Sequence, residues 1–385
     1  MSKRFLPKGV YTLNRRDFLK LGGASLAALG LSPLLKACSP ASTATPEAKI
    51  GGTIDFLSWE GYDFPTCMEN WQKSNGVVMS PSYIGDQSEV QAKLTAGSSV
   101  GYDLISYYNG TANLYIEELK LLQPIDLAKV PNFKKAYNWF QTENYWVRDG
   151  IQWGIPFTWN AEGCVYNIDK MDPIESWFDL LKPQFKDKIA LVDDGYGMIL
   201  MAGVALSLAD KLPNLTQQEL ASVKEFLLAL KGQARGIAAS YGDQSNMMIS
   251  GETIAAFPGW AALCVWAASS GVNLKMNIPK EGGFATTDAF AIPKGADNVE
   301  SALAWINEVL TPGAQACEAM SLAAGVVIPE AYPLLDTSVA SMYDYSDIKA
   351  YLTEKVRLFG YPPTVSDQYA TFEQWNNMWL EVKAA

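Results

Sequence analysis

Among the residue types that could do chemistry in this chain, the most informative is histidine, because it is absent. The 385 residues contain no histidine. Histidine is the usual general base at neutral pH, the base of Ser-His-Asp and Cys-His nucleophile systems, and the commonest zinc ligand. The composition therefore argues against these catalytic classes and against most zinc sites, and we expect neither a cofactor nor a metal.

Carboxylates and cysteines are the reactive groups that remain. Asp193 and Asp194 are adjacent, so on a strand they would point to opposite faces and could not act as the paired carboxylates of a glycosidase. A carbohydrate-active enzyme is therefore the weakest alternative. Beyond Cys38 four cysteines without CxxC spacing allow three complete disulfide pairings, and the sequence does not choose among them; they are Cys67, Cys164, Cys264 and Cys317.

Charge is distributed unevenly along the chain, whose formal net charge is −11. Seven basic residues against Asp17 give the first 37 residues a charge of +6 and leave −17 for the rest. A nucleic-acid-binding protein would normally present a basic face, so we expect no nucleic-acid partner. An acidic body is compatible with a cationic ligand.

The N-terminal segment has the features of an export signal. The sequence NRRDFLK at 14–20 places Arg15 and Arg16 as a twin-arginine pair, and a Gly/Ala/Leu-rich run follows. That run is about 15 residues long, whereas spanning a bilayer needs about 20. We therefore predict a signal peptide over 1–37 and an exported protein, located in the periplasm or on the exterior of the cell envelope.

The residues after the apolar run predict attachment to a membrane. The sequence LKAC at 35–38 resembles a lipobox, in which the cysteine carries lipid, although Lys36 stands where a small residue is usual. Cys38 is thus the predicted lipidation site. Residues 38–50, rich in Ser, Thr, Ala and Pro, are predicted to form a flexible, lipid-anchored linker, with the fold beginning near Gly51.

The periodicity of the remaining sequence predicts strands that alternate with helices. Strands are expected at 53–59, 76–83 and 102–107, with helices at 64–74, 86–94 and 113–121. The pattern begins again at Trp153, with strands at 154–159, 163–167 and 188–192 and a helix at 219–230. An apolar strand at 288–292 could cross back, and a helix at 298–310 follows. This order predicts two α/β lobes with parallel strands, a hinge of crossing strands, and a ligand in the cleft.

The sequence resembles the spermidine/putrescine-binding proteins of bacterial ABC importers, within the wider extracellular solute-binding superfamily. The segments that carry the resemblance are SWEGY at 58–62, YDL at 102–104, GIPFTW at 154–159, SWFDL at 176–180, VDD at 192–194, PKEGG at 279–283 and DAFAIP at 288–293. It implies an α/β fold of the two-lobed, type II periplasmic-binding-protein class, a Venus flytrap. Lobe 1 would comprise 51–155 and 289–325, and lobe 2 would comprise 156–288 and 326–385.

The function that the resemblance implies is binding and delivery, not catalysis. A cationic amine, a polyamine such as spermidine or putrescine, would bind between the lobes and pass to the permease subunits of an ABC transporter. We expect the receptor to be a monomer.

The resemblance also implies ligand residues. Trp59 and Tyr62 match an aromatic pair, and Asp288 and Asp194 match carboxylates that bind amino groups. An ammonium group over an aromatic ring gains roughly 0.5 to 2 kcal/mol, and a carboxylate adds charge-assisted hydrogen bonds. Further candidates that lie near aromatic positions of the family are Trp260, Tyr107 and Tyr108.

Three positions depart from the family's amine-binding set. Gly197 replaces a glutamate, Thr286 a tryptophan and Val326 a tyrosine. A receptor of the same fold for another ligand, such as a quaternary amine, iron(III) or an anion, is therefore the alternative.

Overall fold

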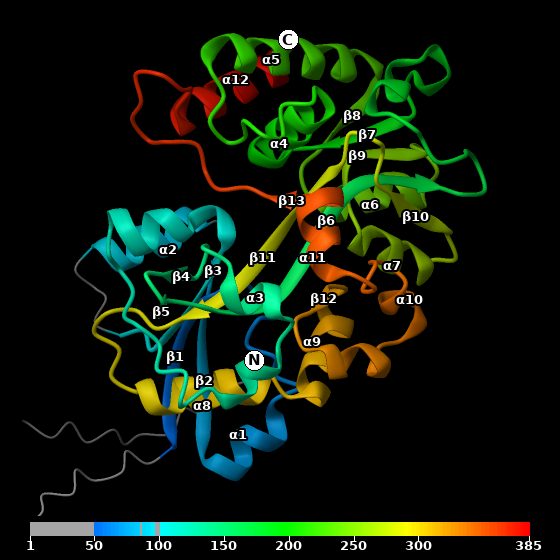
Figure 1. Ribbon diagram of the computed structural model, residues 1–385. Helices are drawn as coiled ribbons and strands as arrows, with labels where there is room; N and C mark the ends of the chain where they lie inside the picture. The colour runs from blue at the N-terminus through cyan, green and yellow to red at the C-terminus, as the bar shows by residue number, and fades with distance from the viewer. Residues whose placement is uncertain (1–49, 85–86, 97–100) are drawn as a thin grey trace, which may run out of the picture. The chain divides into compact units, whose positions relative to one another are not determined.

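Two groups of parallel strands, joined by two crossing strands, form the main sheet of this computed structural model (Figure 1). The structure describes residues 50–84, 87–96 and 101–385. The strands are β1 (Gly52–Ser58), β2 (Val77–Tyr83), β3 (Leu104–Tyr108), β4 (Val147–Arg148), β5 (Ile151–Gln152), β6 (Ile155–Asn167), β7 (Ile189–Val192), β8 (Ala234–Ala238), β9 (Ala255–Trp260), β10 (Leu274–Asn277), β11 (Gly283–Ala291), β12 (Gly325–Val326) and β13 (Val356–Leu358). The α-helices are α1 (Glu69–Asn75), α2 (Gln87–Thr95), α3 (Asn138–Thr142), α4 (Gly195–Ala205), α5 (Gln217–Gln233), α6 (Tyr241–Ile249), α7 (Ala262–Ala268), α8 (Val299–Val309), α9 (Pro312–Leu322), α10 (Thr337–Ala340), α11 (Ile348–Ala350) and α12 (Phe372–Ala384).

The sheet runs in the order β2-β1-β3-β11-β6-β9-β7-β8. In the first group β1 pairs in parallel with β2 and β3, and in the second β7 pairs in parallel with β8 and β9. Antiparallel β6 and β11 connect the two groups and are visible in Figure 1 as the long green and yellow strands. The strand predicted at 288–292 is the second half of β11.

Two elements differ from the sequence-based expectation for identifiable reasons. The strands expected at 154–159 and 163–167 are one strand of 13 residues, β6, because its polar middle pairs with β11 and does not interrupt the ladder. The helix expected from Phe64 begins only at Glu69, because Phe64 has a φ of 45° and cannot lie in a right-handed helix.

The longest helix forms for local reasons that the sequence shows. Thr216 caps α5 in a capping box with Glu219, which satisfies free N–H groups of the first turn. The apolar side chains that recur at helical spacing along this helix are all buried: Leu220, Val223, Phe226, Leu227 and Leu230. Burial of that face against the second strand group is what holds the helix in place.

Two large hydrophobic clusters lie under the two strand groups. One contains β1, α8 and α9 side chains, and the other contains β7, α4, α5 and α12 side chains. Residues of the C-terminal region divide between them: Val326 to Val356 contribute to the first cluster, and Phe359 to Val382 to the second. The segment 326–356, which the sequence assigned to lobe 2, therefore packs with the core of β1.

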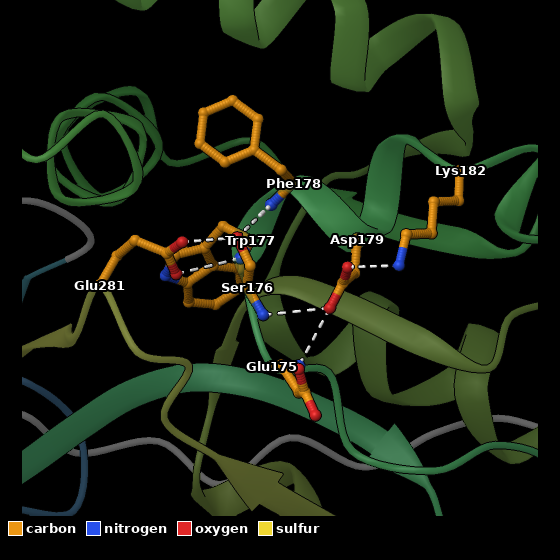
Figure 2. A network of polar contacts seen from close by, with 7 residues as sticks. All are labelled: Glu175, Ser176, Trp177, Phe178, Asp179, Lys182 and Glu281. Atoms are coloured by element: carbon orange, nitrogen blue, oxygen red, sulfur yellow. Dashed lines mark hydrogen bonds and ion pairs between the residues drawn. The ribbon is translucent and has the colours of Figure 1, made fainter.

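The sequence segments SWFDL at 176–180 and PKEGG at 279–283 meet in a polar network beside the start of β11 (Figure 2). Ser176 and the backbone N–H of Trp177 both donate to the Glu281 carboxylate. The Trp177 indole donates to the Gly282 carbonyl at 2.9 Å. Asp179 accepts two backbone N–H groups, both at 3.0 Å, and pairs with Lys182. These motifs therefore anchor the loop that leads into β11 and do not form a ligand site.

Among the described cysteines, Cys67 and Cys317 form a disulfide, and Cys164 and Cys264 are free. The bond ties the segment before α1 to α9. Within the described residues no helix combines the length and the apolarity needed to cross a bilayer.

Candidate ligand-binding site

One face of the crossing strands carries most of the polar residues at the centre of the sheet. Directly paired residues and residues two apart along a strand share a face. The register pairs Asp288 with Thr158, Thr286 with Asn160, and Phe284 with Glu162. We call these positions, with their neighbours on adjacent strands, the strand face. On it Tyr108 of β3 lies opposite Asp288, and Trp260 of β9 lies opposite Glu162.

The first acidic cluster, the Asp288 cluster, consists of Tyr62, Asp288, Gln315 and Glu318. Tyr62 follows β1 and donates its hydroxyl to Asp288 Oδ2 at 3.1 Å. Gln315 and Glu318 lie one turn apart on α9, and the Gln315 amide donates to Glu318 Oε2 at 2.9 Å. Asp288 is 5% exposed and Glu318 is 2% exposed. The cluster thus buries two carboxyl groups from two distant parts of the chain.

Burial dominates the electrostatics of the Asp288 cluster. It raises the pKa of Asp288 to about 7, an effect that the Tyr62 hydrogen bond partly offsets. Burial also raises the pKa of Glu318 well above its usual range; the Gln315 amide opposes this shift and the charge of Asp288 reinforces it. Glu318 Oε1 is buried without a hydrogen-bond partner among the described residues.

The second acidic cluster, the Glu162 cluster, consists of Glu162, Asp194 and Tyr241. Tyr241 begins α6, and its hydroxyl lies 2.8 Å from Glu162 Oε2 and 3.2 Å from Asp194 Oδ2. Asp194 is the N-cap of α4 and accepts the Gly197 N–H at 3.0 Å. Burial raises the pKa of both carboxyl groups, and the charge of Asp194 adds to the shift of Glu162. The Trp260 ring lies 5.9 Å from the Tyr241 ring.

Neither cluster contains a cationic side chain. None of the ion pairs found among residues 50–84, 87–96 and 101–385 involves Asp288, Glu318, Glu162 or Asp194. Asp193, the neighbour of Asp194, is different. Although burial opposes its ionisation, Lys383 and the Trp379 indole hold its pKa below the usual value. The adjacent aspartates therefore differ in their contacts: Asp193 pairs with a lysine and an indole, whereas Asp194 belongs to the Glu162 cluster.

The structure brings four of the predicted ligand residues into the two clusters or beside them: Tyr62, Asp288, Asp194 and Trp260. Tyr108 lies opposite Asp288, and its ring packs against Tyr196 and Tyr361. Burial is the main cause of its raised pKa, and the charge of Asp194 is the smallest of several further causes. Tyr108 thus lies near both clusters.

Trp59 and Tyr107 are placed elsewhere. Tyr107 pairs with Ala289, one position beyond Asp288, so it points to the opposite face, where it is completely buried and donates to the Tyr145 carbonyl at 3.2 Å. Its surroundings are those of a core residue. Trp59 packs against the same core cluster and is partly exposed, so its ligand role stays a prediction. Arg15, Arg16 and Cys38 lie outside the described residues.

Sequence reasoning missed Glu162, Glu318, Tyr241 and Asn160. A usable signal existed for Glu162, because it is the one acidic residue in a strand of 13 residues that is buried throughout. Glu318 had a weaker signal, since it and Gln315 lie one turn apart on an otherwise largely apolar helix. Tyr241 had none, because only the fold brings α6 to β6.

The glycine at position 197 is explained by crowding. A Cβ added there would lie 2.5 Å from Asp194 Oδ2 and 3.2 Å from the Phe284 ring. A longer side chain at this position would displace the cap of α4. The second carboxylate beside Asp194 comes instead from β6, as Glu162.

A cavity of about 710 Å³ is lined by residues that follow β3 and by residues of the C-terminal region, and no residue of either cluster lines it. Asn109, Gly110 and Tyr361 line it together with Pro213, from the connection between α4 and α5, and Asn376 of α12. None of the predicted ligand residues lines this cavity. We place the candidate site at the strand face, because buried carboxylates without cations are a stronger indication of a ligand than open volume. Among the described residues no group of three or more Cys, Asp or Glu side chains is arranged to hold a metal ion.

Residues 67–338 match the family model described as bacterial extracellular solute-binding protein. The chain therefore belongs to the bacterial extracellular solute-binding proteins, a family of binding proteins and not of enzymes. It is 28% identical over 271 residues to the spermidine/putrescine-binding periplasmic protein of Salmonella typhimurium, covering 69% of this chain and 74% of that protein. It is 26% identical over 381 residues to spermidine/putrescine-binding periplasmic protein 1 of Haemophilus influenzae, covering 96% and 99%.

Solved structures confirm the predicted fold. The TpPotD lipoprotein of Treponema pallidum superposes with a TM-score of 0.71 at 20% identity, covering 87% of this chain and 100% of that one. The spermidine/putrescine substrate-binding protein PotD of Streptococcus pneumoniae gives 0.70 at 20% identity, covering 87% and 99%. The two-lobed, type II α/β fold with crossing strands is thus the fold of this chain.

Proposed function

We propose that this chain is the substrate-binding receptor of an ABC importer and that it binds a small cationic amine, of the spermidine or putrescine type, at the strand face. One observation carries the proposal: four buried or half-buried carboxyl groups lie on or beside the strand face in two pairs, and no Lys or Arg of the described residues pairs with any of them. The names of the related proteins point to the same ligands.

The physical argument rests on the cost of burying acids. An ionised carboxylate away from water is strongly unfavourable unless a cation or several hydrogen-bond donors compensate it. An ammonium group of the ligand would supply both charge and donors. The rings of Tyr62 and Trp260 offer aromatic surface next to the acids, which suits the methylene segments of an amine and adds cation–π attraction.

A ligand screen tests this function. Spermidine and putrescine should raise the melting temperature of the purified protein and give saturable heats of binding, because a ligand that binds only the folded state stabilises it by mass action. Glycine betaine, ferric ion, amino acids and maltose serve as comparison ligands. A response to betaine or to iron, with none to primary amines, would contradict the proposal and favour the corresponding alternative.

We further propose that the receptor is exported and tethered to the membrane, and that it works as a monomer. The twin-arginine pair Arg15–Arg16 and the lipobox cysteine Cys38 support this part of the proposal, because an importer's receptor must reach its permease outside the cytoplasm. Cys38→Ala should move the protein from the membrane fraction to the soluble fraction. Lys substitutions at Arg15 and Arg16 should leave unprocessed precursor in the cytoplasm.

The lobe boundaries are part of the same proposal. The packing of residues 326–356 with the core of β1 favours assigning them to lobe 1, and the packing of Phe359 to Val382 favours lobe 2 for the C-terminal helix. Closure of these lobes on the ligand would sequester the strand face. Scattering measurements with and without spermidine should show a more compact receptor when the amine is bound.

A further inference from the structure

The Cys67–Cys317 disulfide joins the same two segments of the chain that build the Asp288 cluster. Cys67 follows Tyr62 by five residues, and Tyr62 donates to Asp288. Cys317 directly precedes Glu318, the second buried acid of the cluster. The bond therefore connects the segment after β1 to α9 close to the points where each contributes a polar side chain to the candidate site.

The helix that carries Glu318 has little apolar surface to hold it in place. The buried side chains of α9 are Gln315, Ala316, Glu318 and Ala319, and an alanine buries only one methyl group. Glu318 Oε1 has no hydrogen-bond partner among the described residues, and a buried carboxyl group with an unpaired oxygen opposes its own burial. The energetics of this face therefore favour displacement of α9 toward water unless another contact holds the helix.

The segment after β1 also needs a contact that maintains its shape. Phe64 has a φ of 45°, a conformation that residues other than glycine adopt at a cost in free energy. Its buried ring stacks on Trp305 with 6.1 Å between the ring centroids. This turn lies between Tyr62 and Cys67 in the sequence. The disulfide thus fixes one end of a strained turn whose other end makes the hydrogen bond to Asp288.

The disulfide closes within one half of the molecule, although its cysteines are far apart in the sequence. Their separation is 250 residues, and the strands of the second group, β7, β8 and β9, lie between them in the chain. Around the bond, Cys67, Met68, Ala316 and Ala319 pack into or against the hydrophobic cluster that contains β1 side chains. A movement of the second strand group therefore leaves the bond and the side chains beside it together.

We infer that the Cys67–Cys317 disulfide positions the Asp288 cluster and thereby sets the affinity of the receptor for its amine. The cysteines are positioning residues, because they act through the two segments that they join. Opening of the bond frees α9 to move and Glu318 to reach water, so that the cluster loses one of its two acids. This inference rests on the proposed function and deepens it, because it adds a control of affinity that lies outside the strand face.

The same bond makes the affinity depend on the redox state of the compartment. Both cysteines are partly exposed, so a dissolved thiol or disulfide can reach them. When the bond forms, the two thiols lose two protons and two electrons, and a disulfide oxidant takes these up and becomes two thiols. Disulfides persist in the cell envelope and are rare in the reducing cytoplasm. The precursor therefore has the low-affinity site, and the proposed export produces the high-affinity one.

Reduction of the unmodified receptor is the first test. Spermidine is titrated by calorimetry into the oxidised protein and into protein treated with dithiothreitol, and a thiol assay confirms that the two cysteines of the bond have become free. We expect the reduced receptor to bind about tenfold more weakly, within the range usual for groups coupled through one contact network, and reoxidation to restore the affinity. Equal affinities of the folded oxidised and reduced forms would overturn the inference.

Variants connect the effect to Glu318. The double substitution Cys67→Ser and Cys317→Ser should reproduce the weak binding of the reduced protein. In a Glu318→Gln receptor the same double substitution should have a much smaller effect, because α9 then carries no acid whose position matters. A role of the bond in overall stability alone would give the same loss of affinity in both backgrounds, and that result would refute the positioning of Glu318.

Hydrogen exchange measures the position of α9 without any ligand. After reduction, the backbone amides of α9 should exchange faster, while those of α8 should keep their protection, because only α9 is held by the bond. This measurement applies even where a variant is too unstable for titration. Unchanged protection of α9 in the reduced protein would contradict the inference.

Ser321→Ala is the matched control. Ser321 is an exposed residue of α9 whose hydroxyl lies 3.9 Å from Cys67 Sγ, and its removal leaves the disulfide closed. The affinity of this variant for spermidine and its response to reduction should equal those of the unmodified receptor. If the oxidised receptor binds no amine, the proposed function fails; if it binds amines and reduction leaves the affinity unchanged, only the present inference fails.

Discussion

The network around Ser176 and the two acidic clusters are both built from buried or half-buried acids, but only the acids of the network pair with a cationic side chain. In the network, the carboxylates of Asp179 and Glu281 receive backbone N–H groups, a hydroxyl and a lysine. In the clusters, the acids accept from tyrosine hydroxyls, an amide and, at Asp194, one backbone N–H, and one oxygen of Glu318 has no partner among the described residues. A carboxylate that accepts several hydrogen bonds stabilises the fold, whereas a buried one with an unpaired oxygen costs stability.

Removing a charge from the Asp288 cluster gives the largest expected effect on binding. Asp288→Asn should weaken amine binding by about 3 kcal/mol, roughly a hundredfold, because a charge-assisted hydrogen bond to the ligand is lost. The unliganded protein should be as stable as before or more stable, since a buried acid has been removed. Calorimetric titration and thermal unfolding of the same preparation measure both. Unchanged affinity would show that Asp288 does not contact the ligand.

In the network around Ser176 we expect the opposite outcome, a loss of stability with the amine affinity kept. Glu281→Ala should lower the free energy of unfolding by about 2 kcal/mol, because Ser176 and the Trp177 backbone lose a charged acceptor. Amine affinity should change little, since no atom of this side chain belongs to the strand face. Chemical denaturation gives the stability and titration gives the affinity. A large loss of affinity with intact stability would erase the distinction between the two regions.

A change of pH tests the role of the Asp288 carboxyl group in amine binding without mutation. The pKa of Asp288 is raised to about 7 in the folded protein, so below that pH the group carries a proton that the ligand must displace. Affinity should rise about tenfold from pH 6 to pH 8, as expected for one ionisation with this pKa. The nearby titratable groups are Tyr62 and Glu318, and the pKa values of both are also raised.

The stability of the unliganded protein should depend on pH in the reverse direction. The folded pKa of Asp288 lies above its unfolded value, so the folded state holds more protons between about pH 4 and pH 7. This contribution to stability is complete below that range and is lost as the pH rises through it. In Asp288→Asn both pH dependences should become weaker. Retention of the full affinity change in that variant would assign it to another group.

The smallest effect is expected from a single cap in the network. Asp179→Ala removes the carboxylate that accepts the Glu175 and Ser176 N–H groups and should cost about 1 kcal/mol of stability, the usual value for a lost cap. Amine affinity should stay within experimental error. Comparing the thermal unfolding of Asp179→Ala with that of Glu281→Ala would show whether the loss of this cap destabilises the protein less than the loss of the Glu281 acceptor.

The fold was largely predictable from sequence because it depends on patterns that repeat along the chain. Alternating strands and helices indicated two α/β halves, and the apolar spacing along α5 matches its buried face. The errors fell where polar residues enter buried structure. β6 was divided in two because Asn160 and Glu162 interrupt its apolar pattern, and Glu162 belongs to the candidate site.

The site was only partly predictable for the same reason. Tyr62, Asp288 and Asp194 follow strand ends or lie in motifs that the family preserves, so similarity could indicate them. Glu318 and Tyr241 come from helices that approach the strand face only after folding, and no local spacing links them to Asp288 or Glu162. Tyr107 and Tyr108 show the limit most clearly, because adjacent tyrosines on one strand point to opposite faces.

The continuity of β6 and β11 through both clusters has a consequence for how such a receptor can change its ligand. Positions on one face of a strand recur only every two residues, about 6.6 Å apart. Moving an acid by a single residue would turn it into the core. A substitution that shifts an acid along β6 or β11 therefore keeps it on the strand face only if it moves the acid by two residues, so the spacing between the acidic clusters can change only in steps of about 6.6 Å.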